Sequence, residues 1–214
     1  MDLNLPQRLY LLGYDVDRGR PDPVGNAQRG RLLCAAAVVD LIGRGLLRER
    51  DGRVERTLSS RTPDDRLLSL VLSGVPSHRP RHWVDLVHRR MVESEEHVRD
   101  GLAARGVITV GGRRILGLFP SRTITLTDAD RVRGLHARTR AAVVEEHDVA
   151  AVDGEDLALA VIASEGEIQT AFTARERWDH RRTLAAFHGR FDAAFPGLRT
   201  AIGTAVRASK GPTG

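Results

Sequence analysis

An apolar run between Leu32 and Leu47 constrains the fold of this chain more than any other feature. Its first eight residues are all apolar, and Asp40 is the only acidic residue within it. A helix that is apolar on nearly every side must be enclosed by other elements. The run is too short and too interrupted to span a bilayer, which needs about 20 apolar residues. It therefore predicts a central buried helix, ended by Gly43 and Gly45 because glycine readily adopts a C-cap conformation.

A second nearly apolar helix is predicted between Asp153 and Ser164, where residues 157–163 are all apolar. Two helices of this kind indicate a bundle core with amphipathic helices packed around it. Further helices are expected at residues 5–12, 62–73, 81–105, 128–146, 174–194 and 198–208, the third of them as one helix or as two divided near Glu93. The fold class is therefore mainly α, a helical bundle around a buried central helix.

A short β-hairpin is predicted over residues 46–57. The dipeptide Asp51-Gly52 lies between two strand-like runs there, and it favours a tight primed turn. No linker rich in proline, glycine or serine divides the chain, so we expect one domain over residues 1–209 and a flexible tail at 210–214.

A second short β-hairpin is predicted over residues 107–118. Gly111 and Gly112 are expected to form its turn, and Arg113 and Arg114 follow directly. Glycine pairs are common in two-residue hairpin turns because both positions need a positive φ. The two arginines would then lie beside the turn, where they could touch lipid phosphates.

The charge balance permits an anionic partner without demanding one. Lysine and arginine number 33 against 28 acidic residues, and Lys210 is the only lysine. A GC-rich genome is the simplest reason for so much arginine, yet each guanidinium keeps its charge and can grip a phosphate through two donors. Cys34 is the single cysteine, and no signal peptide is evident, so we expect a reducing, cytoplasmic location.

Clusters of histidine and carboxylate side chains were considered as metal or catalytic sites. The clusters are His78 with His82, residues 93–97, and residues 145–148. Pro80 separates the two histidines of the first cluster. Glu93 stands three residues before Glu96 and four before His97, but no second such pair appears elsewhere. No nucleophile elbow, dinucleotide-binding or phosphate-binding glycine motif is present. We therefore expect no metal, no cofactor and no enzymatic activity.

A row of arginines raises the alternative of nucleic-acid binding. Arg131, Arg133, Arg138 and Arg140 lie along one predicted helix, but acidic residues follow at 145 and 146. Aromatic residues make up 4% of the chain, so platforms for stacking bases are scarce. Nucleic acid is therefore an unlikely partner.

Four segments spread along the chain carry a resemblance: residues 5–13 (LPQRLYLLG), 38–46 (VVDLIGRGL), 101–108 (GLAARGVI) and 157–172. Their order and spacing resemble the Golgi phosphoprotein 3-like family, whose eukaryotic members are peripheral membrane adaptors that bind phosphatidylinositol 4-phosphate. Its bacterial branch, which this chain resembles, consists of shorter chains. The resemblance implies a mainly helical fold with a central bundle. It also implies that the hairpin at 107–118 self-associates and faces a membrane.

The family's headgroup pocket uses one tryptophan and three arginines. The matching positions here fall near Gly25, Cys34, Val92 and Glu95, which carry other side chains. Four arginines close to these positions are the candidates for an anionic lipid site instead: Arg29, Arg31, Arg89 and Arg99. Arg29 and Arg31 lie at the expected start of the central helix, where free N–H groups and the helix dipole favour an anion.

The sequence thus predicts a peripheral, non-enzymatic module that binds anionic, phosphoinositide-like lipid headgroups through arginines and self-associates through a hairpin. Each arginine near an anionic surface contributes about 1 kcal/mol, so four to six would give weak, salt-sensitive attachment. The alternative is a cytosolic protein-interaction adaptor without lipid binding, whose arginine-rich faces meet an acidic, unidentified protein partner.

Overall fold

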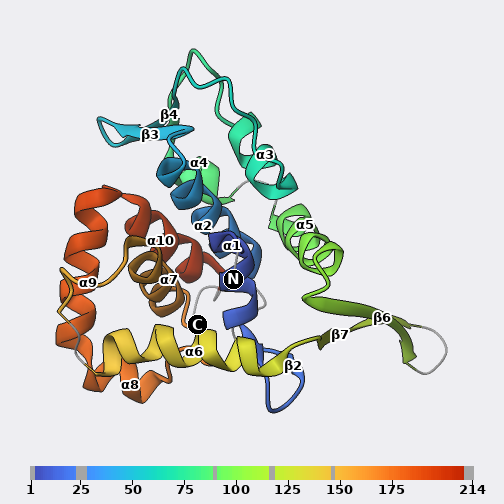
Figure 1. Cartoon of the computed structure of the whole chain (residues 1–214). Coiled ribbons are helices and arrows are strands. Elements are labelled where there is room, and N and C mark those ends of the chain that lie inside the picture. Colours follow the sequence, from blue (N-terminus) through green and yellow to red (C-terminus); the bar gives the residue numbers. More distant parts are fainter. Residues whose placement is uncertain (1–2, 23–27, 89–90, 116–118, 146–147, 210–214) are drawn as a thin grey trace.

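The structure, a computed structural model, describes residues 3–22, 28–88, 91–115, 119–145 and 148–209. Within these ranges we describe no side chain at 91–92, 113–115, 119–122 or 209. The described residues form ten helices and three small antiparallel sheets, which confirms the predicted mainly α class (Figure 1).

The helices are α1 (Leu5–Leu12), α2 (Arg29–Gly43), α3 (Arg66–Ser73), α4 (Trp83–His88), α5 (Met91–Ala104), α6 (Ala129–Val144), α7 (Gly154–Glu165), α8 (Ala174–Asp179), α9 (Arg181–Ala194) and α10 (Leu198–Ser209). The strands are β1 (Tyr14–Asp15), β2 (Arg20–Pro21), β3 (Leu47–Arg50), β4 (Arg53–Arg56), β5 (Arg81–His82), β6 (Ile108–Ile115) and β7 (Phe119–Leu126). Pairing joins β1 with β2, β3 with β4 and β5, and β6 with β7.

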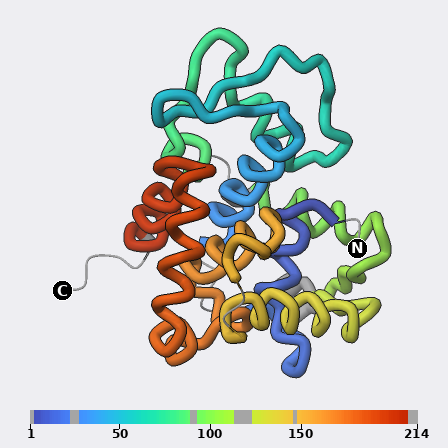
Figure 2. The backbone as a smooth tube through the Cα atoms, turned by 60° about the vertical axis from the view of Figure 1, so that its left-hand side comes forward, coloured from blue at the N-terminus to red at the C-terminus, as the bar shows by residue number. Residues whose placement is uncertain are grey.

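Helix α2 forms the centre of the core, as its apolar run predicts. Residues 35–38 and Leu41 are fully buried, and α2 contacts α1, α3, α4, α5, α7 and α10. Helix α7 is the second enclosed helix, with residues 157–164 all buried. Figure 2 shows the C-terminal helices α8 to α10 (orange to red) along one side of α2. The segment from β3 to α3 extends beyond one end of the bundle in both views.

Local sequence signals account for the start of α1 and for the end of α2. Asn4 caps α1 by accepting a hydrogen bond from the Gln7 N–H at 2.9 Å, and the Gln7 side chain accepts one from the Asn4 N–H at 3.3 Å. Helix α2 ends at Gly43, and Gly45 has a φ of 67°. The Leu46 N–H then donates back to the carbonyl of residue 41 at 2.9 Å, which closes the last turn.

The predicted turn at Asp51-Gly52 is confirmed, since these residues have φ values of 52° and 74° between β3 and β4. The sequence does not predict a third strand, because Arg81 and His82 stand at the start of the expected helix over 81–105. Both pair with β4 instead. The expected helix over 81–105 is divided into α4 and α5, and residues 89–90 between them lie outside the description.

The predicted turn at Gly111-Gly112 is wrong. Both glycines lie within β6, opposite Thr123 and Arg122, and the hairpin continues to the pair Ile115 and Phe119. The physical reason is the distribution of β-branched residues. The observed register places Thr109 opposite Thr125 and Val110 opposite Ile124, which are all β-branched. A turn at the glycines would have paired residues 108–110 with the arginine-containing segment 113–115.

One further helix prediction needs correction. Residues 174–194 form two helices, α8 and α9, which meet at His180 (φ −99°, ψ 25°). Thr173 and Glu176 form a capping box at the start of α8. The short pair of strands β1 and β2 was also not anticipated, because the loop residues around it gave no strand pattern.

Candidate functional site

Arg29, at the start of α2, is a buried cation that a carboxylate of α5 already holds. Its Nη1 lies 2.9 Å from Glu95 Oε1, and its Nη2 donates to the Asp22 carbonyl at 3.1 Å. The guanidinium also lies over the Tyr10 ring, 5.7 Å from the centroid. Only 8% of Arg29 is exposed. The Arg29 guanidinium therefore already has a carboxylate partner within the protein, Glu95.

The phenol of Tyr10 shows how closely these charges are gathered. Its hydroxyl is buried without a hydrogen-bond partner. Burial raises the pKa of Tyr10 to about 12; Glu95 adds to the rise, while Arg29 and Arg99 oppose it. Two of the four predicted arginines thus act on one buried ring.

Arg99 belongs to the same cluster and also has acidic neighbours. Its Nη2 lies 3.7 Å from Glu96 Oε1 and 3.7 Å from Asp100 Oδ1, and its side chain is 12% exposed. Together with Glu95, three carboxylates therefore balance the two cations Arg29 and Arg99. Among the residues that the structure describes, these carboxylates outnumber the two cations that they accompany.

Arg31 points to a different part of the molecule. Its Nη1 donates to the Ala205 carbonyl of α10 at 3.0 Å, and its Nε is buried without a hydrogen-bond partner. Burial lowers the pKa of His88 in α4, and the charge of Arg31 lowers it further. Arg89 lies outside the described residues. The structure therefore brings Arg29 and Arg99 together but directs Arg31 elsewhere, and their role in lipid binding stays a prediction.

The hairpin formed by β6 and β7 projects from the helical body (Figure 1). Three arginines occur between residues 107 and 127, and no acidic residue occurs there. In the register of the strands, Arg113 stands opposite Ser121 and Arg114 opposite Pro120, next to the apolar segment 115–120. Arg113 and Arg114 therefore lie within β6 and not beside a turn at Gly111-Gly112, and their role at a membrane stays a prediction.

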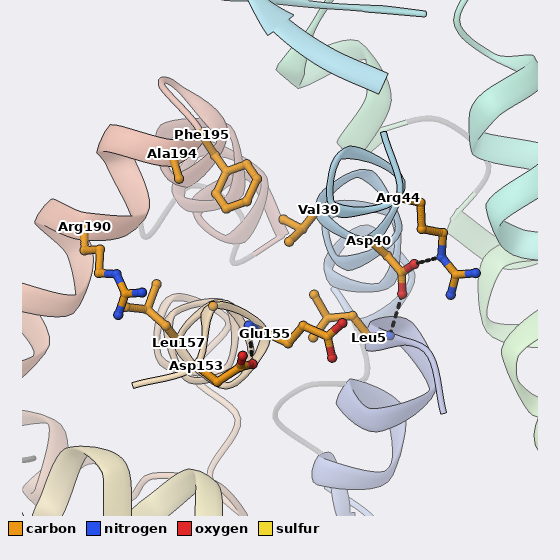
Figure 3. Close-up of a pocket in the computed structure, with 12 residues that line it drawn as sticks. Leu5, Val39, Asp40, Arg44, Asp153, Glu155, Leu157, Arg190, Ala194 and Phe195 are labelled. Carbon is orange, nitrogen blue, oxygen red and sulfur yellow. Dashed lines mark hydrogen bonds and ion pairs between the residues drawn. The ribbon is translucent and has the colours of Figure 1, made fainter. Parts of the chain in front are cut away.

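A cavity of about 460 Å³ lies where the ends of α1, α2, α7 and α9 meet (Figure 3). Leu5, Val39 and Phe195 are apolar residues in its lining. Its polar groups serve the fold: Asp40 accepts a hydrogen bond from the Leu5 N–H at 2.8 Å and pairs with Arg44. These contacts connect the start of α1 to the end of α2, so the polar groups of this cavity stabilise the packing of the two helices.

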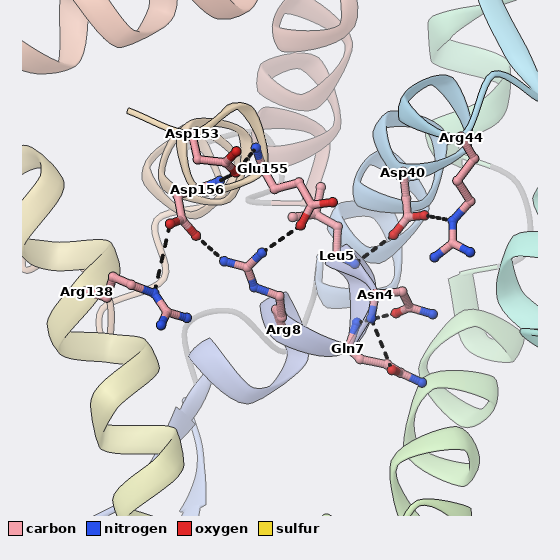
Figure 4. A network of polar contacts seen from close by, with 10 residues as sticks. All are labelled: Asn4, Leu5, Gln7, Arg8, Asp40, Arg44, Arg138, Asp153, Glu155 and Asp156. Atoms are coloured by element: carbon pink, nitrogen blue, oxygen red, sulfur yellow. Dashed lines mark hydrogen bonds and ion pairs between the residues drawn. The ribbon is translucent and has the colours of Figure 1, made fainter. Parts of the chain in front are cut away.

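A second network, which the sequence did not predict, is centred on Arg8 (Figure 4). The Arg8 side chain is 10% exposed, pairs with Glu155 at 3.0 Å, and also contacts Asp156. Arg138 of α6 reaches the same Asp156 at 3.9 Å. Arg8 thereby links α1 to α7. Its position within an apolar helical segment was the one signal that could have revealed a buried ion pair.

The arginines of α6 mostly have carboxylate partners. Arg133 pairs with Asp130 at 2.8 Å and with Asp17 at 3.4 Å, and Arg140 pairs with Glu176. Because these pairs neutralise the row, α6 offers little charge to a nucleic-acid backbone. No group of three or more metal-ligating side chains occurs among the described residues.

The fold and these clusters define a mainly helical module whose most distinctive surface feature is a projecting basic hairpin. The chain belongs to the Golgi phosphoprotein 3 (GPP34) family, whose model matches residues 5–205. This family consists of non-enzymatic adaptors. A search of the curated proteins found no match. Within the described ranges, each helix is too short or too polar to cross a membrane.

Proposed function

We propose that this protein is a peripheral, non-enzymatic adaptor that binds an anionic membrane surface through the β6–β7 hairpin. The observation that carries the proposal is the composition and position of that hairpin. Three arginines and no acidic residue occur between residues 107 and 127, and the sequence is apolar at 115–120. The strands β6 and β7 stand away from the helical body (Figure 1). Basic side chains next to apolar ones are typical of segments that lie in the membrane interface.

The expected attachment is weak and reversible. Arg113, Arg114 and Arg122 would each contribute about 1 kcal/mol near an anionic surface, and this contribution falls as salt screens the charges. Apolar side chains that enter the interface would add about 25 cal/mol for each Å² removed from water. The hairpin alone could therefore hold the protein on the cytoplasmic face of a membrane without a pocket for one headgroup.

The same hairpin is the proposed site of self-association. Among the described residues, β6 and β7 pair only with each other, so each strand has an outer edge without a partner strand. Such edges readily pair with another chain. Val110, on β6, is 40% exposed. Two copies could join edge to edge and double the number of arginines that face one membrane.

The proposal does not require Arg29 or Arg99. A lipid phosphate that used Arg29 would have to displace Glu95 from a contact of 2.9 Å. Breaking a buried pair leaves an uncompensated charge, which is costly. A headgroup site at Arg29, Arg31, Arg89 and Arg99 is therefore the secondary proposal. The variant Glu95→Gln, which removes the negative charge beside Arg29, distinguishes it from the hairpin.

Co-sedimentation with vesicles tests the proposal. Phosphatidylcholine vesicles would be compared with vesicles that also contain phosphatidylserine or phosphatidylinositol 4-phosphate. The double variant Arg113→Gln/Arg114→Gln should lose most binding to the anionic vesicles. Its matched control, Arg53→Gln/Arg61→Gln, removes the same charge from two exposed positions in and just after β4, at the end of the bundle away from the hairpin, and should bind as the wild type does.

Each outcome decides between candidates. If Glu95→Gln strengthens binding and the hairpin variant has no effect, the headgroup site near Arg29 replaces the hairpin. If the wild type binds neutral and anionic vesicles equally, membrane attachment by charge is contradicted. The alternative, an adaptor that binds an acidic protein through its arginines without lipid, would then take its place.

A further inference from the structure

A small cavity beside α3 has no role in the proposed function. Its volume is about 160 Å³, and residues of α2, α3, α4, α5 and β5 line it. Leu70, Val71, Pro76 and Leu86 give it a largely apolar wall. An apolar cavity of about 150 Å³ is large enough to hold one benzene molecule, so this one suits a ligand of about six non-hydrogen atoms.

One cation lies on this apolar wall. Arg81 lines the cavity, and its Nε is buried without a hydrogen-bond partner. Its backbone pairs with Val54 of β4, which fixes the residue at the end of the sheet. A buried donor without a partner is rare in folded proteins and requires an explanation. An anionic ligand in the cavity would supply the missing acceptor.

Two further residues of the lining, Cys34 and Ser94, are polar but uncharged. Cys34 Sγ lies 3.1 Å from Ser94 Oγ, and both residues are buried. Burial raises the pKa of the Cys34 thiol, so the thiol stays neutral and does not compete for Arg81. Ser73 is exposed, and Pro76 and Arg81 are half-buried, so the cavity opens beside Arg81. A ligand would place its charged group at the opening and its apolar part inside.

We propose that this cavity binds a small aliphatic carboxylate, with its carboxylate on Arg81 and its hydrocarbon chain against Val71 and Leu86. A guanidinium matches a carboxylate through two parallel hydrogen bonds. Inorganic phosphate offers a similar head but no apolar part to fill the wall. This inference does not depend on membrane binding.

Cys34 supplies the readout, because it is the only cysteine of the chain. Hexanoate should slow the reaction of the Cys34 thiol with a maleimide and should raise the melting temperature. Hexan-1-ol and hexylamine have the same chain length without the negative charge, and acetate has the charge without the chain. Each of these three should bind at least about tenfold more weakly than hexanoate, as titration calorimetry would measure.

Two variants test whether Arg81 binds the carboxylate of hexanoate. Arg81→Gln should weaken hexanoate binding by about tenfold or more, whereas Arg79→Gln, at an exposed position two residues earlier, should leave it unchanged. If Arg81→Gln fails to fold by circular dichroism, Val71→Phe, which fills the cavity and keeps Arg81, should abolish binding. Equal affinity for hexanoate and hexan-1-ol, or hexanoate binding that survives Val71→Phe, would overturn the proposal.

Discussion

The guanidinium of Arg29 and the carboxylate of Glu95 lie 2.9 Å apart where α2 packs on α5, with 9% of the arginine side chain and 33% of the glutamate side chain exposed. This contact joins the start of the central helix to a neighbouring helix. It also removes from the surface the cation that the sequence made most attractive for a phosphate. The charge of Arg29 is therefore already balanced within the fold.

Replacing Glu95 should destabilise the fold. Glu95→Gln leaves Arg29 buried with a weaker partner, so we expect the free energy of unfolding to fall by about 1–3 kcal/mol, less than for a fully buried pair because Glu95 is partly exposed. Urea unfolding measures this loss. Asp85→Asn, at an exposed position of α4, should change stability by no more than about 0.5 kcal/mol. A loss for Glu95→Gln as small as that of the control would show that the ion pair contributes nothing.

Stability should fall at alkaline pH because of Tyr10. The folded protein holds the phenolic proton up to a pKa of about 12, whereas the unfolded chain releases it near 10. The contribution of this phenol is thus fully present below pH 10 and is lost as pH rises to about 12, a change of about 2 to 3 kcal/mol. Lys210 is the only lysine, so few other groups titrate in this window.

Urea unfolding at several pH values measures this slope, and Tyr10→Phe isolates it from the raised pKa values of Tyr14 and Cys34, which act in the same direction. The Tyr10→Phe protein should lose less stability than the wild type between pH about 10 and about 12. Equal slopes in the two proteins would contradict a buried, neutral phenol at residue 10.

Two glycine-to-alanine changes should have opposite effects. A methyl group at Gly166 would lie 2.9 Å from the Ile162 carbonyl oxygen and would collide with Leu32 of α2. We expect Gly166→Ala to destabilise the protein by about 1–3 kcal/mol. Gly134 is exposed on α6, and a methyl group added there would meet no neighbouring atom within 4 Å. We expect Gly134→Ala to stabilise the protein by about 0.5–1 kcal/mol. Thermal unfolding measures both effects. Melting temperatures that shifted in the same direction in the two variants would contradict this expectation.

Self-association should depend on the outer edge of the hairpin. Val110→Lys places a charge on β6, and charges on edge strands oppose pairing with another chain. Sedimentation velocity over a range of concentrations should show weaker association for this variant than for the wild type. Val84→Lys is the matched control, because Val84 is 44% exposed on α4 and Val110 is 40% exposed. Equal weakening by both variants would show that the hairpin is not part of the interface.

Local signals made much of this fold predictable. The apolar runs of α2 and α7 identified the two enclosed helices, since nothing but surrounding helices can cover them. The Asp51-Gly52 turn and the glycine at the end of α2 were predictable for a different reason. Each depends on the φ angle of one or two residues rather than on distant contacts.

Contacts between distant segments were not predictable in this way. The partner strand of residues 108–110 lies 14 or more residues away, and only the register shows that Gly111 and Gly112 do not turn the chain. Glu95 lies in the acidic cluster at residues 93–97, and its partner Arg29 is 66 residues earlier in the chain. Arg8 and Glu155 are separated by 147 residues. A single sequence gives no measure of such pairings.

The salt dependence of vesicle binding tests the central claim most directly. Association of the wild type with phosphatidylserine-containing vesicles should weaken steadily as salt rises, because screening reduces the attraction between the arginines and the lipid phosphates. The Arg113→Gln/Arg114→Gln protein should bind more weakly at low salt and respond less to added salt. Binding that is independent of salt, or a variant that responds to salt as strongly as the wild type, would contradict attachment through the hairpin.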